Sequence, residues 1–190
     1  LKDQEFEMTL KSKISNKDIE NTVTEGSIGT IFYPVDKGIS KAKIKSLINI
    51  SNKTKTPVLF SKSTYPYKTI GILVNNNFGE STSNSIAFDL ASSLSASLVA
   101  VNITQPKFLQ SEDTAQIFDS LEKMQDLALS YEVQLDFENH EGNEAKTFSE
   151  LSSKFDLSII GNGNNQSWQS RKTTEFISSN SKSSVLYIPS

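Results

Sequence analysis

The fold is decided at residues 69–80, which read Thr-Ile-Gly-Ile-Leu-Val-Asn-Asn-Asn-Phe-Gly-Glu. The first six residues form a continuous apolar run of strand length, as expected when both faces of a sheet are covered. A polar, glycine-containing loop follows at 75–81, and apolar residues then recur at helical spacing from Ile86 to Leu94. A buried strand that leads through such a loop into a helix predicts an α/β fold with a mainly parallel sheet.

The same alternation extends in both directions along the chain. Further strands are predicted at 5–10, 30–35, 57–60, 98–103, 133–137, 157–160 and 185–188, with helices at 16–26, 39–50, 115–131, 144–153 and 171–179. Asn16 is the predicted cap of the first helix. Ligands of parallel sheets usually lie beyond the carboxyl ends of the strands, where the strand order reverses. The loops 75–80 and 161–166 and the strand end at Asn102 are therefore the places to search for a site.

Residues 5–60 resemble residues 132–187 at a constant offset of 127 positions, with Val58-Leu59-Phe60 falling on Val185-Leu186-Tyr187. A repeat predicts two related units. The later copy is preceded by strand–helix–strand–helix at 68–130, whereas nothing comparable precedes the earlier one. We therefore expect a partial unit at 1–63, comprising the last three strands, and a complete unit at 64–190. The polar, proline-containing stretch 61–67 is the expected linker.

Composition excludes several classes of function. Cysteine is absent, so disulfides, thiolate metal sites and cysteine nucleophiles are excluded. A net charge of −3 argues against a general nucleic-acid binder. There is no signal peptide, and no apolar run reaches the roughly 18 residues of a membrane span. We expect a cytoplasmic location.

The chain carries no recognisable catalytic motif. It lacks a Gly-Lys-Ser/Thr phosphate loop, and no nucleophile stands at recognisable spacing from a base. We therefore expect that it is not an enzyme. His140, the only histidine, lies near Glu138 and Glu141, which fits either a metal site or a surface residue. Positive charge gathers in the first unit, either as a solvated helix face or as a contact for lipid or an acidic partner: Lys37, Lys41, Lys43, Lys45, Lys53 and Lys55.

Three segments make residues 68–189 resemble a universal stress protein domain. They are the strand and loop at 72–80, Phe155-Asp156-Leu157-Ser158-Ile159-Ile160-Gly161, and Ser184-Val185-Leu186-Tyr187-Ile188-Pro189. The family has similar segments, with a glycine after its fourth strand and a final strand that ends in proline. The resemblance implies a parallel-sheet, three-layer α/β/α sandwich of the adenine nucleotide alpha hydrolase-like type, preceded here by a truncated second copy. We expect no metal site, because no second ligand motif accompanies His140.

The resemblance also implies where a nucleotide would bind. ATP-binding members carry Gly-x2-Gly-x9-Gly-Ser/Thr after the fourth strand, where backbone donors hold the phosphates. Here Gly161 matches the first glycine, Asn164 replaces the second, and no glycine–hydroxyl pair follows. Asn77 replaces the family's aspartate after the first strand. The resulting degenerate site is predicted to comprise Asn75, Asn77, Asn102, Gly161, Gly163 and Asn164. In an alternative interpretation, the glycine and asparagine residues at 161–165 form an ordinary turn between a strand and a helix.

The leading hypothesis is a non-catalytic, cytosolic regulatory or sensory module without a native cofactor. Tandem modules of this kind resemble the cytosolic tails of bacterial cation (Na⁺ or K⁺)/proton antiporters, which implies a membrane transporter domain in the same polypeptide. The alternative is an ATP- or adenine-nucleotide-binding stress protein. Protein–protein contacts are expected in either case, as an intrachain pseudo-dimer or a homodimer. The pseudo-dimer predicts that the strand at 185–188 pairs with the strand at 58–60.

Overall fold

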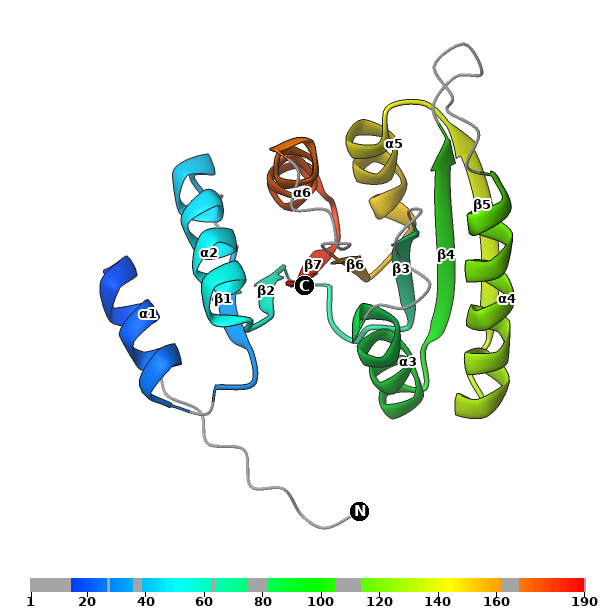
Figure 1. The fold of residues 1–190 in the computed structure, drawn as a ribbon, viewed down its shortest axis with the longest axis horizontal. Helices are drawn as coiled ribbons and strands as arrows, with labels where there is room; N and C mark the ends of the chain where they lie inside the picture. Colours follow the sequence, from blue (N-terminus) through cyan, green and yellow to red (C-terminus); the bar gives the residue numbers. More distant parts are fainter. Residues whose placement is uncertain are drawn as a thin grey trace.

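A computed structural model describes residues 15–26, 28–35, 39–62, 64–74, 82–104, 114–161 and 168–189. Seven strands form one sheet in the order β1-β2-β7-β6-β3-β4-β5 (Figure 1). The strands are β1 (Ile31–Pro34), β2 (Val58–Ser61), β3 (Thr69–Val74), β4 (Ser97–Thr104), β5 (Leu135–Glu141), β6 (Leu157–Gly161) and β7 (Ser184–Ile188). The helices are α1 (Asn16–Glu25), α2 (Lys41–Thr54), α3 (Thr82–Leu94), α4 (Thr114–Tyr131), α5 (Glu144–Leu151) and α6 (Trp168–Asn180), with a 3-10 turn η3 (Ser152–Lys154) after α5.

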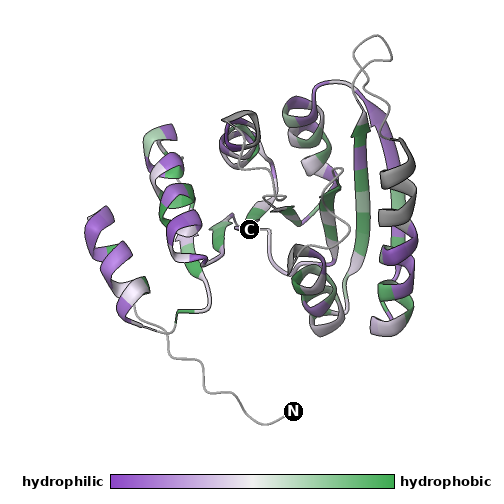
Figure 2. Ribbon diagram, viewed as in Figure 1, coloured by the Kyte–Doolittle hydropathy of each residue, from purple (hydrophilic) through white to green (hydrophobic). Residues whose placement is uncertain are grey.

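Helices cover both faces of the sheet, which gives the α/β architecture that the sequence predicts. One apolar core joins side chains of α1, α2, α5 and α6 to one face. The second core lies on the opposite face, beneath α3 and α4. Figure 2 shows the hydrophobic colouring concentrated on the strands and on the inner sides of the helices, while α1 is hydrophilic along most of its length.

Close packing at the centre of the sheet requires a glycine. A Cβ on Gly71 in β3 would lie 2.2 Å from the ring of Phe155, which is itself buried. The ring therefore occupies the volume that a side chain at position 71 would need. This contact brings the segment that leads into β6 close against β3, the strand that β6 pairs with.

Seven of the eight predicted strands and all of the predicted helices are present, with shifted ends. The predicted strand 133–137 is observed at Leu135–Glu141, because β4 pairs with it as far as Thr104↔Glu141. The helix predicted at 39–50 continues to Thr54 and ends where Lys55 adopts a left-handed conformation. The predicted cap Asn16 is wrong: Ser15 caps α1, in a reciprocal capping box with Asp18. The strand predicted at 5–10 lies outside the described residues.

The two halves of the sheet meet at its single antiparallel pair. β2 pairs with β7 in the register Val58↔Tyr187, Leu59↔Leu186 and Phe60↔Val185, which confirms the predicted pairing of these strands. The buried Tyr187 donates a hydrogen bond of 2.6 Å to Asn52 Oδ1 of α2, so α2 and β7 are also linked through side chains. The strands before and after the predicted linker 61–67 therefore belong to one continuous sheet.

The strand register repeats the sequence offset. Ile31↔Val58 in β1–β2 becomes Ser158↔Val185 in β6–β7 when 127 is added to each number, and the next three pairs correspond in the same way. The antiparallel pair is centred on Leu59↔Leu186, two positions that are themselves related by the offset. These two strand pairs are thus related by an approximate two-fold axis that passes through the β2–β7 junction.

Candidate functional site

The strand order reverses between β3 and β6. From β3 the chain proceeds to β4 on one side, while β6 pairs with the other side of β3. The helix after β3, α3, lies in the core of one face, and the helix after β6, α6, lies in the core of the other. Connections that leave toward opposite faces open a crevice at the carboxyl ends of the two strands. This edge is the candidate site.

Asn102 brings a buried amide to this edge. In register it lies between Val74 at the end of β3 and Asn139 of β5. Only 9% of the residue is exposed, and its Nδ2 donates to Asn139 Oδ1 at 3.2 Å. The bond fixes the orientation of the amide, and the side-chain oxygen Oδ1 of Asn102 has no hydrogen-bond partner among the described residues. A ligand at the edge would therefore meet an oriented acceptor.

Gly161 ends β6 at the same edge of the sheet, paired with Ile188 of β7 and partly exposed. The structure therefore brings Asn102 and Gly161, from two different strands, to one edge. The predicted site residues Asn75, Asn77, Gly163 and Asn164 lie outside the described residues. Trp168 is the first residue of α6, so the amino end of that helix follows the loop after β6.

Glu144 is a titratable residue near this edge that the sequence did not single out. It begins α5, directly after the cap Asn143, whose side chain accepts the Lys146 N–H at 3.0 Å. Burial raises the pKa of the Glu144 carboxyl above its ordinary value of 4.5, even though a helix amino end favours a carboxylate. The sequence gives no local signal for this residue, because its burial depends on neighbouring elements.

His140 belongs to an ion cluster on β5. Its Nε2 lies 2.8 Å from Glu138 Oε2, and Lys154 Nζ lies 3.2 Å from the same oxygen. The hydrogen bond from His140, followed by Lys154, lowers the pKa of Glu138 against an opposing effect of burial. Among the residues that the structure describes, no three histidine or acidic side chains are grouped as a metal site. Within the described part of the chain, His140 thus contacts the Glu138 carboxylate.

Two lysines of the first unit form polar contacts with α1. Lys53 forms an ion pair with Glu20, and Lys43 Nζ donates to Asn16 Oδ1 at 2.8 Å. Lys43 also lies 5.8 Å from the centre of the Tyr33 ring. These contacts join α2 to α1 and agree with a solvated helix face, with two of the lysines used to hold α1 in place.

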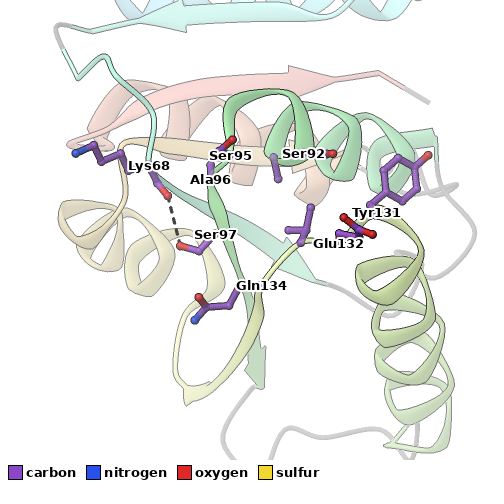
Figure 3. A pocket seen from close by; sticks show the side chains of 10 residues that line it. Lys68, Ser92, Ser95, Ala96, Ser97, Tyr131, Glu132 and Gln134 are labelled. Carbon is purple, nitrogen blue, oxygen red and sulfur yellow. Dashed lines mark hydrogen bonds between the residues drawn. The ribbon is translucent and has the colours of Figure 1, made fainter.

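A pocket of about 520 Å³ lies at the opposite edge of the sheet, at the amino ends of β3, β4 and β5 (Figure 3). Its rim includes Lys68, Ser97, Glu132 and Gln134. Ligand sites usually have a few polar groups that converge on one point. In Figure 3 the side chains of Lys68 and Glu132 extend away from each other at opposite ends, and the carbonyl of Lys68 is already bonded to Ser97. The carboxyl edge is therefore the better candidate.

No family model matches the sequence of the chain, and no curated protein does either. None of the described helices offers a membrane span, since each is too short or too polar to cross a bilayer.

Solved structures are similar in fold. A putative universal stress protein from Pseudomonas aeruginosa matches with 17% identity and a TM-score of 0.61, over 94% of this chain and 69% of that one. A universal stress protein from Archaeoglobus fulgidus matches with 13% identity and a TM-score of 0.62, over 85% of this chain and 60% of that one. A universal stress protein in complex with cAMP matches with 19% identity and a TM-score of 0.53, over 65% of this chain and 97% of that one. The chain thus has the universal stress protein fold.

Proposed function

We propose that the chain is a universal-stress-protein-like module that binds an adenine nucleotide at the carboxyl edge of the sheet, between β3 and β6. The observation that carries this proposal is the reversal of strand order there, with α3 and α6 leaving toward opposite faces. The similar universal stress protein solved with cAMP supports the choice of an adenine nucleotide as ligand. The alternative function considered from the sequence is therefore favoured over a module without a ligand.

The described residues suggest distinct roles in such a site. The carbonyl oxygen of Asn102 is an acceptor for the amino group of an adenine ring, because its orientation is fixed through Asn139. Gly161 lets the ligand approach the backbone at the end of β6 without a side chain between them. The amino end of α6 supplies a partial positive charge toward phosphate oxygens. No group in these roles transfers a proton or attacks a bond, so the proposed module is non-catalytic.

Calorimetric titration of the full chain with ATP, ADP and cAMP, with magnesium present, tests the proposal. We expect saturable heat with at least one nucleotide, and binding at least tenfold weaker in Asn102→Leu, which keeps the branched shape of the side chain but removes the amide. Lys68→Ala, in the pocket of Figure 3, is the matched control and should bind as the parent does. Absence of heat with all three ligands, or equal affinity in Asn102→Leu, would contradict the proposal. Nucleotide recovered intact after long incubation would support the absence of catalysis.

We propose further that residues 16–61 are the second half of another unit of the same kind. The shared offset of the strand registers and the two-fold relation at β2–β7 support this relationship. On this basis the module acts through contacts between such units, and a regulatory role follows if nucleotide binding at one edge changes those contacts. Sedimentation with and without nucleotide would detect such a change in solution.

The antiporter-tail hypothesis remains a prediction. It requires a membrane transporter domain in the same polypeptide, and the described part of the chain contains none. The sequence of the parent gene upstream of the codon for Leu1 tests it directly. A series of apolar spans there would support the hypothesis, whereas a short soluble reading frame would contradict it.

A further inference from the structure

The helices α2 and α6 begin at equivalent positions but end differently. At the offset of 127, Lys41 at the start of α2 corresponds to Trp168 at the start of α6. α2 continues to Thr54, whereas α6 ends at Asn180, one residue before the equivalent position. The last carbonyl groups of a helix need partners from outside the regular hydrogen bonding. The two helices obtain these partners in different ways.

The end of α2 is closed by its own residues. Lys55 adopts a left-handed conformation, with a φ of 56°, and its N–H donates to the Ser51 carbonyl. The Thr56 N–H donates to the same carbonyl at 3.2 Å. In the other direction, the Ser51 hydroxyl donates to the Thr56 carbonyl at 2.6 Å. These three hydrogen bonds link the last turn of α2 to the residues that follow it.

The end of α6 is attached to neighbouring elements instead. Lys182, the equivalent of Lys55, lies outside the left-handed region, and its N–H donates to Ser152 Oγ of η3 at 2.7 Å. The Ser183 hydroxyl lies 2.7 Å from the Ser158 hydroxyl of β6. The segment after α6 is therefore held by η3 and β6, where the segment after α2 is held by its own helix.

One buried hydroxyl has no role in this arrangement of α6. Ser178, the equivalent of Ser51, is 1% exposed, and its Oγ has no hydrogen-bond partner among the described residues. The Ser183 carbonyl, which corresponds to the acceptor that Ser51 uses, accepts from Ser181 Oγ at 3.3 Å. A buried donor without a partner destabilises the arrangement that contains it. An end like that of α2 would remove this effect, because Ser178 would then donate to the Ser183 carbonyl.

Each arrangement satisfies a group that the other does not. The observed one satisfies the Lys182 N–H through Ser152 but leaves the Ser178 hydroxyl unpaired. The alternative would satisfy both Lys182 and Ser178 within one helix end, but it requires a left-handed conformation that is unfavourable for lysine. Ser152 Oγ would keep its own donation to the Ser149 carbonyl at 2.6 Å. Two packings of one segment that differ so little in free energy can exchange.

The linker between the two units contacts the same segment. Lys62, the first residue after β2, donates through Nζ to the Ser181 carbonyl. Its backbone N–H donates to Ser184 Oγ at 2.9 Å, and the Tyr67 hydroxyl donates to the same oxygen at 3.1 Å. A rearrangement of residues 181–183 would therefore reach the linker as well as η3.

We propose that residues 181–183, at the carboxyl end of α6, exchange between two states. In the observed state η3 and β6 hold the segment. In the second state Lys182 is left-handed, its N–H donates to the Ser178 carbonyl, and the Ser178 hydroxyl donates to the Ser183 carbonyl, as the equivalent groups do in α2. The exchange releases η3 from α6 and alters the contact of Lys62 beside β2, so it couples the complete unit to the first. The proposal is independent of nucleotide binding.

The test displaces the equilibrium from each side and measures the backbone of Lys182. In the ¹³C,¹⁵N-labelled full chain, the Lys182 Cα shift and the coupling between its amide and α protons report a left-handed conformation. Ser152→Ala removes the acceptor of the observed state and should raise the left-handed population at least fivefold. Adding Ser178→Ala should lower it again, because the second state needs that hydroxyl. Adding Ser179→Ala instead is the matched control and should not, since Ser179 Oγ donates to the Glu175 carbonyl within α6.

A second variant keeps the proposal testable if thermal melting shows that Ser152→Ala does not fold. Lys182→Gly retains Ser152 and favours a left-handed residue after the helix, so the amide resonances of Ser152 and Ser158 should shift as η3 and β6 lose their contacts. A Lys182 backbone unchanged in folded Ser152→Ala would overturn the proposal. So would a left-handed population that is insensitive to Ser178→Ala, or unchanged Ser152 and Ser158 resonances in Lys182→Gly.

Discussion

The two halves of the sheet have the same strand register but differ in what surrounds it. β6–β7 is flanked by β3 and covered on both faces, and every described residue of β7 is buried. β1–β2 has the same pairing, but among the described residues no strand pairs with the outer side of β1, and its Phe32 is exposed. The hydrogen-bond register therefore does not determine how much each strand pair contributes to the stability of the fold. The elements packed around each pair determine that contribution, because they set how much apolar surface is buried.

The largest expected difference is between positions 159 and 32. Ile159→Ala should lower the free energy of unfolding by about 3 kcal/mol, because the side chain is fully buried and its removal leaves a cavity. Phe32→Ala should cost less than about 1 kcal/mol, because most of the ring is already in water. Urea unfolding of the two variants measures both values. Similar losses would contradict this difference in burial between the two positions.

The next effect tests the link between the halves. Tyr187→Phe makes position 187 identical to its equivalent Phe60 and removes the hydrogen bond to Asn52. We expect a loss of about 1 kcal/mol in unfolding free energy, because the hydroxyl group lies in a buried residue. Asn52→Ala should cost a similar amount, and the double variant should cost less than the sum of the two. Additive losses in the urea experiment would mean that the two side chains do not cooperate.

A smaller effect separates two serines related by the offset. Ser51 Oγ donates to the Thr56 carbonyl at 2.6 Å, whereas Ser178 Oγ is buried without a partner among the described residues. Ser51→Ala should therefore lower the unfolding free energy by about 1 kcal/mol. Ser178→Ala should leave it unchanged or raise it, because the substitution removes an unsatisfied hydroxyl. Thermal melting at one pH measures both, and an equal loss in the two variants would count against this difference.

The smallest expected effect depends on pH and concerns Glu144. Because the folded-state pKa of this carboxyl lies above its ordinary value of 4.5, the folded form holds the proton more tightly than the unfolded chain does. The wild-type chain therefore loses stability as the pH rises through the folded-state pKa. Glu144→Gln should be more stable than wild type at neutral pH and equal to it below about pH 4. Melting temperatures across this range test the sign. A variant that is less stable at neutral pH would show that the carboxylate has a stabilising partner.

Much of the fold could be predicted from the sequence because its central strands carry the signal locally. β3 and β6 are continuous apolar runs, and the repeat of Val58-Leu59-Phe60 indicated the junction with Val185-Leu186-Tyr187. β5 was placed too early because its second half is polar, as suits an edge strand, and its end is set by pairing with β4.

The site was predictable only where a strand end marks it. Asn102 was found because it directly follows the apolar run Leu98–Val101 of β4, although the strand continues to Thr104. Its partner Asn139 could not be found, because the register of β4 against β5 brings the two side chains together. The burial of Glu144 depends on neighbouring elements in the same way. Residues that meet only through strand pairing and helix packing cannot be identified from a fixed spacing in the sequence.

The most direct test of the proposed nucleotide site compares the two halves in one experiment. Amide resonances of the ¹⁵N-labelled full chain would be followed during titration with ATP and magnesium. We predict saturable shifts at Val74, Asn102 and Gly161, at the carboxyl edge of the complete unit, and none at Ser61 at the corresponding end of β2. No shifts at these three residues, or shifts confined to the pocket beside Lys68 and Gln134, would contradict the account.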